Sequence, residues 1–249
     1  MGQIPTVRAI DDAMVTIDTD AVRTGEVHAW TGHVRYAPGH GGNEAWALEL
    51  APRSALSAGV ASVGGTERER FTLAGGEVVV YDCADPPNAR WAAWLGPWHM
   101  AHGMFYPPLW EPWDVVEAFT RLRWTDTPQG LTATSDGRFR LHRAIYLLPV
   151  AGVGTVRVEP RALAPIRPPR WRGYPTAAGE MWRLPGRRDP REESLLMVTD
   201  TAVVTVSPWD APRKGPAARR ENLSAGPEAG TAEAAARFLA QVADVRWGA

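Results

Sequence analysis

The stretch RERFTLAGGEVVVYDC, residues Arg68–Cys83, indicates the fold class of this chain. Its two arms are rich in residues that favour strands, and the Ala74–Gly76 triplet between them supplies the glycines that a tight turn needs. The pattern therefore predicts a β-hairpin. Further hairpins are predicted at 26–50, at 130–149 with its turn at Asp136-Gly137, and at 193–208. The segment VGTVRVEP should pair back onto the strand that ends near Pro149.

Two helices interrupt this β pattern. The first is predicted over Glu111–Leu122, with an apolar stripe at Val115, Val116, Phe119 and Leu122. The second is predicted over Thr231–Val245, with Thr231 as its N-cap. We therefore expect a mainly β fold, a single curved antiparallel sheet (an open half-barrel) with one inserted helix and a C-terminal helix. The predicted domains are a half-barrel at 1–210, a flexible Gly/Pro-rich linker at 211–230 and a C-terminal amphipathic helix at 231–249.

Composition excludes some function classes. The chain has 27 basic and 28 acidic residues, and this balance argues against a nucleic-acid binder that neutralises phosphates. Cys83 is the single cysteine, so the chain can form neither an internal disulfide nor a cysteine-based zinc site. The first twenty residues lack a signal-peptide pattern, and no stretch has the ~18 apolar residues of a spanning helix. We expect a cytoplasmic protein without a membrane span, unless a leader has been removed.

The order of segments resembles a known superfamily. The run TGHVRYA…EAWALEL, then RERFTLAGGEVVVYDCADPPNARWAAW, a short helix near WEPWDVVEAF and GLTATSDGRFRLHRAIYLLP is similar to the LolA-like lipoprotein carriers and the N-terminal domain of RseB-like sensors. The resemblance covers roughly residues 20 to 210. It implies an unclosed antiparallel sheet that wraps short helices and leaves an apolar concave face. Those proteins are normally exported, whereas no signal is recognisable here, and this departure bears on the carrier function more than on the fold.

An aromatic-rich stretch, Arg90–Asp114, is the main candidate site. Gly96 and Pro97 interrupt it, which favours irregular backbone, so part of the stretch should lie at the surface. We expect Trp91, Trp110 and Trp113 to be mostly core. The residues expected to line an apolar ligand cleft are Trp94, Trp98, Met100, Met104, Phe105 and Tyr106, with His99 and His102 as polar groups that orient the ligand. Alternatively, most of these aromatic residues are core, or exposed tryptophans form a sugar-binding platform.

Two functions remain open from the sequence. The first is a non-catalytic binding protein that holds an apolar, lipid-like ligand or a partner protein in this cleft, without a cofactor or a metal ion. The alternative is an enzyme, such as a metal-dependent hydrolase, that uses His99 and His102 in the same cleft, because their i, i+3 spacing can bring two imidazoles to one ion. The arginine-rich loops around Trp171 are a further candidate, either as a site for an acidic partner or a phosphate, or as a solvated face. No phosphate loop, nucleophile elbow or dinucleotide fingerprint is present.

Overall fold

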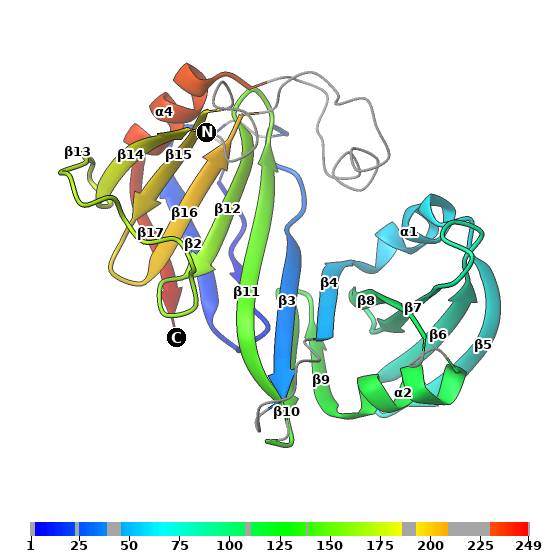
Figure 1. Cartoon of the computed structure of the whole chain (residues 1–249). Helices are drawn as coiled ribbons and strands as arrows, with labels where there is room; N and C mark the ends of the chain where they lie inside the picture. The colour runs from blue at the N-terminus through cyan, green and yellow to red at the C-terminus, as the bar shows by residue number, and fades with distance from the viewer. Residues whose placement is uncertain are drawn as a thin grey trace. The chain divides into compact units, whose positions relative to one another are not determined.

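A computed structural model describes residues 3–22, 25–38, 46–107, 111–137, 139–185, 193–208 and 230–248 of the 249-residue chain (Figure 1). Strands account for 53% of the structure and helices for 14%, so the chain is mainly β. The predicted class, an open antiparallel sheet with an inserted helix and a C-terminal helix, is confirmed. No helix among the described residues has both the length and the apolar character needed to cross a membrane.

The chain forms two compact units, which we describe separately. Unit 1 contains residues 1–7, 13–30 and 145–249, and unit 2 contains residues 8–12 and 31–144. The long strand β11 (Phe139–Val150) contributes its second half to unit 1 and its first half to unit 2. Whether residues 1–210 behave as one folding domain stays a prediction.

Unit 1 contains two antiparallel sheets. The larger one has the strand order β13-β14-β15-β16-β12-β11. Its strands beside β11 are β12 (Gly154–Pro160), β13 (Tyr174–Pro175), β14 (Glu180–Pro185), β15 (Glu193–Val198) and β16 (Ala202–Ser207). The smaller sheet joins β1 (Val7–Arg8), β2 (Met14–Thr19) and β17 (Val242–Gly248). The predicted pairings of β11 with β12 and of β15 with β16 are confirmed.

The core of unit 1 lies between these sheets. Valines that alternate along β12 and β16 are fully buried, as the period of two along a strand requires. The Tyr146 ring contacts both Trp30 and Trp247 edge-on, with ring centroids 6.4 and 5.5 Å apart. On its other face the larger sheet buries Trp182, Leu196 and Val203 beneath the chain that follows β12.

Unit 2 is a sheet with the strand order β11-β3-β4-β8-β7-β6-β5. The strands are β3 (Thr31–Pro38), β4 (Trp46–Pro52), β5 (Thr66–Leu73), β6 (Gly76–Asp82), β7 (Arg90–Leu95) and β8 (His99–Phe105). The hairpins predicted at 26–50 and 68–83 are confirmed as β3–β4 and β5–β6. A separate pair, β9 (Leu122–Thr127) with β10 (Gly130–Ser135), completes the unit.

Helices lie over the unit 2 sheet (Figure 1). The short 3-10 turn η1 (Arg53–Ala55) leads into α1 (Leu56–Ser62), a helix that the sequence did not predict. Leu56 and Val60 of α1 pack over a cluster that includes Trp91 and Cys83. The predicted inserted helix is α2 (Pro112–Thr120), and it buries Val115, Val116 and Phe119 as expected.

Two predicted elements are wrong. The turn at Asp136-Gly137 exists, since Ser135 Oγ accepts hydrogen bonds from the backbone of Gly137 and Phe139. Its flanking strands nevertheless diverge, because β10 pairs with β9 whereas β11 pairs with β12 and β3.

The second wrong prediction is the length of the C-terminal helix. The segment 231–249 is not helical throughout: α4 (Ala232–Ala240) ends early, and β17 follows it. A β-bulge between Val242 and Asp244 shifts the strand register, so Val242 and Val245 are both buried although they are three residues apart. That spacing imitates a helical face, which is why the sequence pattern misled the prediction. The predicted linker at 211–230 lies outside the described residues, except for Gly230.

Candidate functional site

The aromatic stretch that the sequence singled out is a regular hairpin, contrary to expectation. Strands β7 and β8 pair from Arg90 with Phe105 to Leu95 with Met100, and the chain turns at Gly96–Trp98. The glycine and proline that suggested irregular backbone occupy the turn. Of the predicted core tryptophans, Trp91 is buried as expected, Trp113 is 71% exposed and so corrects the prediction, and Trp110 lies outside the described residues.

The predicted cleft residues divide between interior and surface. Trp94, Met100 and Phe105 are buried, and Met104 is half-buried. The Trp94 ring stacks on Trp124 with centroids 5.1 Å apart, and Phe105 contacts Phe119 of α2. Only Trp98 and Tyr106 are exposed, each by about half. These contacts make most of the set part of the unit 2 core, and ligand binding at this hairpin stays a prediction.

The two histidines of the stretch point to opposite faces of β8. Positions three apart on a strand alternate, so the i, i+3 spacing that serves a helix separates these imidazoles on a strand. His99 pairs with Asp126 of β9, with its Nδ1 2.7 Å from the carboxylate. His102 instead packs against Trp91 and faces Glu49 of β4. The structure therefore does not bring His99 and His102 together at one point.

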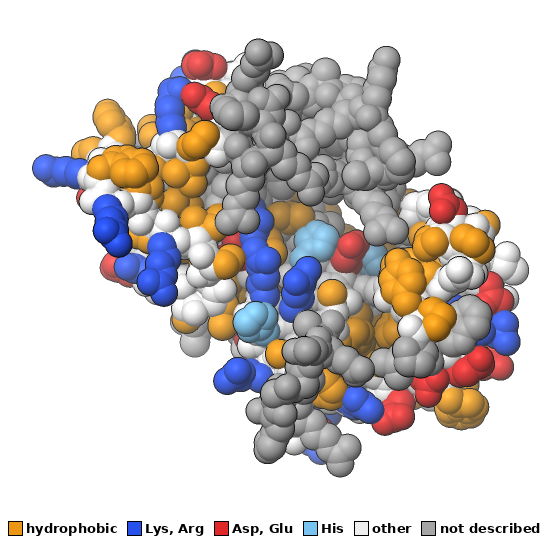
Figure 2. Space-filling model, viewed as in Figure 1, with side chains coloured by type: hydrophobic (Ala, Val, Ile, Leu, Met, Phe, Trp, Pro, Cys, Tyr) orange, Lys and Arg blue, Asp and Glu red, His pale blue; other side chains and the backbone are white. Residues whose placement is uncertain are grey.

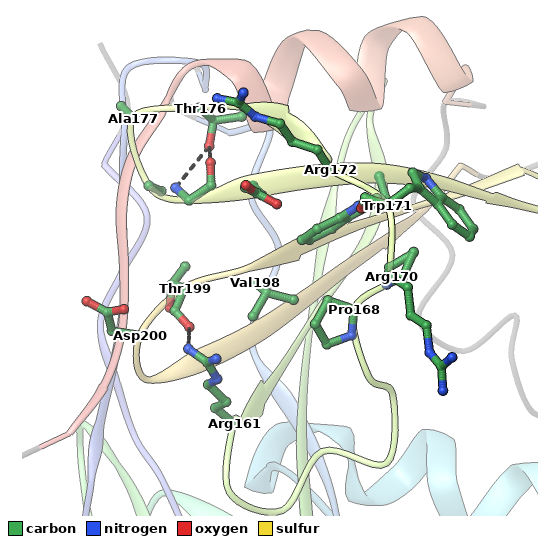
Figure 3. Close-up of a pocket in the computed structure, with 15 residues that line it drawn as sticks. Arg161, Pro168, Arg170, Trp171, Arg172, Thr176, Ala177, Val198, Thr199 and Asp200 are labelled. Atoms are coloured by element: carbon green, nitrogen blue, oxygen red, sulfur yellow. Dashed lines mark hydrogen bonds between the residues drawn. The ribbon is translucent and has the colours of Figure 1, made fainter.

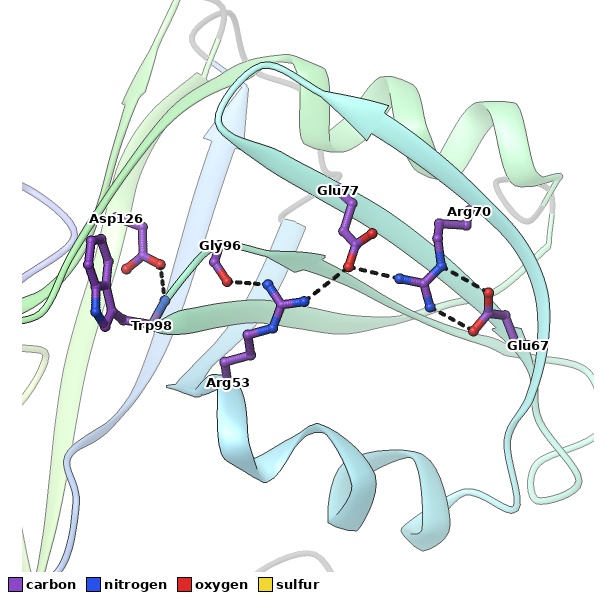
Figure 4. Close-up of polar contacts among 7 residues, drawn as sticks. All are labelled: Arg53, Glu67, Arg70, Glu77, Gly96, Trp98 and Asp126. Carbon is purple, nitrogen blue, oxygen red and sulfur yellow. Dashed lines mark hydrogen bonds and ion pairs between the residues drawn. The ribbon is translucent and has the colours of Figure 1, made fainter.

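The turn between β7 and β8 is held from two sides (Figure 4). Asp126 Oδ2 accepts the backbone N–H groups of Trp98 and His99, at 2.7 and 3.0 Å. On the other side, Arg53 Nη1 donates to the Gly96 carbonyl at 2.6 Å, and Arg53 Nη2 lies 3.2 Å from a carboxylate oxygen of Glu77. The exposed Trp98 ring is therefore carried on a fixed turn.

The chain of polar contacts continues to the edge strand β5. Arg70 Nη1 lies 2.8 Å from the same Glu77 oxygen, and Arg70 donates to both carboxylate oxygens of Glu67, at 3.0 and 2.8 Å. These hydrogen bonds lower the pKa of Glu67. Because Arg70 and Glu67 are well exposed, the pairs contribute little to the stability of the fold. They fix orientation and do not assemble a reactive centre.

Unit 1 carries a shallow groove of about 940 Å³ (Figure 3). Its walls are the loop at 168–172, the turn at 176–180 and the β15–β16 turn at Thr199–Asp200. Buried Trp182 and half-buried Val198 also line the groove. Gly173 lets the loop approach Trp182, because a Cβ at that position would lie 2.6 Å from the indole ring. Trp182 Nε1 donates to the Trp171 carbonyl at 3.0 Å and so fixes the loop on the sheet.

Charged side chains and an exposed tryptophan lie together in this groove. Trp171 is 65% exposed, and Arg170 and Arg172 flank it in sequence. Arg161, the third arginine, donates from Nη1 to the Thr199 carbonyl at 2.9 Å. Glu180 and Asp200 are the two carboxylates of the lining. Figure 2 shows basic and hydrophobic side chains next to one another over the part of unit 1 where β13 lies.

The guanidinium groups of the two loop arginines can bind a carboxylate of another molecule. Within the described part of the chain, neither Arg170 nor Arg172 forms an ion pair. A guanidinium presents a planar fork of donors that matches a carboxylate, and an indole face accepts an apolar side chain. The sequence pointed to these loops through their Pro/Arg composition and Trp171. It could not show that β14 and β15 bring Trp182 and Val198 beneath them.

No protein family model, no curated protein and no solved structure matches this chain. The resemblance to LolA-like carriers therefore stays a prediction. The function has to be argued from the geometry of the described residues.

Proposed function

We propose that this protein is a non-catalytic binding protein that holds an acidic segment of a partner protein in the groove beside Trp171. The observation that carries the proposal is the exposed Trp171 ring between Arg170 and Arg172, two arginines without acidic partners in the described residues. Tryptophan and arginine are the side chains that most often dominate binding energy at protein interfaces. An exposed ring on a loop that is fixed by a hydrogen bond also loses little entropy on binding.

The groove favours a segment with two kinds of side chain. Carboxylates would pair with the guanidinium groups, and apolar side chains would pack on Trp171 and near Val198. The lining includes neither a histidine nor a cysteine, and its two threonines have structural roles. Thr176 Oγ1 accepts from the Gly179 backbone at 3.1 Å, and Thr199 Oγ1 accepts from the Ala202 backbone at 3.0 Å. This chemistry supports recognition rather than a reaction.

The test is fluorescence polarisation with labelled peptides of one design. The first probe alternates glutamate with leucine, the second has glutamine in place of glutamate, and the third has serine in place of leucine. The proposal predicts that the first peptide binds best and that its affinity falls as salt is raised, because exposed charge pairs are screened. Equal binding of the glutamate and glutamine peptides would contradict it.

Substitutions test whether the peptide binds in the groove beside Trp171. Trp171→Ala should weaken binding of the first peptide by roughly 30-fold, as expected for a central aromatic anchor. The double variant Arg170→Ala/Arg172→Ala should weaken binding and flatten the salt dependence. The matched control is Arg237→Ala, an exposed arginine on α4 that is not part of the groove lining. If Arg237→Ala has the same effect as the double variant, binding is a general effect of charge.

A further inference from the structure

Strand β5 forms one edge of the unit 2 sheet. In the part of the chain that the structure describes, it pairs with β6 only and stands last in the strand order. The outer side of an edge strand presents backbone N–H and C=O groups to which another extended chain can add. β5 has 8 residues, more than the about five or six of a usual strand. Unit 2 therefore offers a long edge to a partner.

The charged side chains of β5 restrict which partner can use this edge. The strand contains the run Glu-Arg-Glu-Arg, and charged residues on an edge strand usually prevent unselective pairing. Three of the four are engaged within the chain: Glu67 and Arg70 pair with each other, and Arg68 Nη1 lies 3.2 Å from a carboxylate oxygen of Asp82. The fourth, Glu69, is exposed. Its carboxylate is the charge that a partner strand can match.

Glu69 and Phe71 stand on the face of the sheet that α2 covers. In the β5–β6 register they lie directly opposite Val80 and Val78, and directly paired residues share a face. The ring of Trp113, on α2, contacts Phe71 with centroids 5.0 Å apart, which identifies this face. A carboxylate and an aromatic pair therefore lie two residues apart along the edge.

Trp113 is the exposed member of that aromatic pair. It is 71% exposed, the largest fraction among the exposed large hydrophobic residues that the structure describes. Asp114 follows it in α2, and neither Asp114 nor Glu69 forms an ion pair within the described ranges. Figure 2 shows acidic side chains gathered over the part of unit 2 where β5 and α2 lie, beside hydrophobic ones. We call Glu69, Phe71, Trp113 and Asp114 the Trp113 patch.

We propose that a basic, extended segment of a partner protein docks on the Trp113 patch as an added strand along β5. An apolar side chain of the segment packs on Trp113, and a lysine or arginine two residues away pairs with Glu69. Backbone hydrogen bonds along β5 supply affinity, and the side-chain pattern supplies selectivity. The patch lies on unit 2 and the groove on unit 1, so either proposal can fail without the other.

The test is fluorescence polarisation of the full-length protein with labelled strand-forming peptides. The first probe carries leucine and lysine two residues apart between threonines, so that both side chains stand on one face of a strand. The second has glutamate in place of lysine, the third has serine in place of leucine, and the fourth has methylated backbone nitrogens that cannot donate hydrogen bonds. The first probe should bind with a micromolar dissociation constant that rises with salt, and the others should bind roughly tenfold more weakly.

Two exposed residues of the patch are the positions for mutation. Trp113→Ala and Glu69→Gln should each weaken binding of the first probe roughly tenfold, and Glu69→Gln should also reduce the preference for lysine over glutamate. Exposed substitutions of this kind leave the fold intact. The matched controls are Glu233→Gln, an exposed glutamate on α4, and Trp171→Ala, the exposed tryptophan of the groove. Both controls should leave the affinity unchanged.

Several outcomes would overturn the proposal. Wild-type protein could fail to bind the first probe at millimolar concentration, or could bind the methylated probe equally well. Both patch variants could bind as tightly as wild type, or either control could lose as much affinity as they do. Sedimentation velocity supplies the last outcome: a dimer that Trp113→Ala converts to monomers would mean that a second copy of the chain covers the patch.

Discussion

Asp126 and His99 form a close pair in unit 2, with His99 Nδ1 2.7 Å from Asp126 Oδ1. The Asp126 side chain is 1% exposed, and its other oxygen accepts the backbone N–H groups of Trp98 and His99. Both carboxylate oxygens are therefore used, and a buried carboxylate with such partners is well compensated. The pair fastens the start of β8 to β9, two strands that the sheet itself does not join.

The first prediction follows from those contacts. Asp126→Ala should lower the free energy of unfolding by about 2–3 kcal/mol, because partners of a lost buried acceptor are left without their hydrogen bonds. Asp126→Asn should cost less, since its amide oxygen still accepts one of them. Urea denaturation of the two variants measures the difference. The exposed Asp18→Ala is the control, and a similar loss there would mean that the contacts to the β7–β8 turn are not the cause.

The second prediction concerns the glycine at the same turn. A Cβ at Gly96 would overlap Asp126 Oδ2 and lie 2.7 Å from Cη2 of the buried Trp94. Gly96→Ala should therefore be destabilising by roughly 1–3 kcal/mol, the usual cost of overpacking. Gly248→Ala is the matched control, because no atom lies within 4 Å of a Cβ built at that position. Thermal unfolding compares the two, and an unchanged melting temperature for Gly96→Ala would contradict the packing around Asp126.

The third prediction separates two aromatic side chains of α2. Phe119 is completely buried against Trp46, Phe105 and Trp124, whereas Trp113 is exposed and contacts Phe71 at the surface. Phe119→Ala should cost about 3–5 kcal/mol, and Trp113→Ala less than about 1 kcal/mol. Urea denaturation of both variants checks the order. Equal costs would show that α2 is docked in another orientation.

Trp113 and Val245 show where local sequence patterns fail to predict burial and secondary structure. The stripe Val115, Val116 and Phe119 correctly predicts the buried face of α2, because helical periodicity reports burial directly. Trp113 precedes that stripe and is exposed, although its place at the start of the helix suggested an apolar anchor in the core. At Val245 a bulge makes a strand imitate a helical spacing, and a single sequence does not reveal bulges.

The neighbours of a side chain in a sheet depend on strand pairing, which a single sequence does not reveal. His99 and His102 are neighbours in the chain, yet they lie on opposite faces of β8. The actual neighbours, Asp126 for His99 and His33 with Glu49 for His102, come from distant segments through the β9 contact and the strand register. A turn at Asp136-Gly137 was predicted, and Gly137 has a positive φ of 91°, but tertiary pairing of β10 with β9 decided where the flanking strands go.

The fourth prediction tests the start of α4. Thr231 is its N-cap, and the side-chain oxygen accepts a hydrogen bond from the Ala234 backbone at 3.0 Å. Thr231→Ala should cost about 1 kcal/mol, because the helix loses an acceptor for one of its free N–H groups. Thr231→Ser keeps that acceptor and should be close to wild type. If both variants unfold at the same urea concentration as wild type, the cap makes no contribution to the stability of unit 1.

The last prediction uses the single cysteine of the chain as a reporter for unit 2. Cys83 is 8% exposed and belongs to the cluster that Leu56 and Val60 of α1 cover. Burial raises the pKa of the Cys83 thiol, with a smaller effect from the nearby carboxylate of Asp82, and the thiolate is the reactive form. Native protein should therefore react slowly with a thiol reagent at neutral pH, and denatured protein rapidly. Val60→Ala should accelerate the native reaction, because opening of α1 then costs less free energy. A fast reaction in the wild-type native state, or no acceleration in Val60→Ala, would mean that α1 does not cover this cluster.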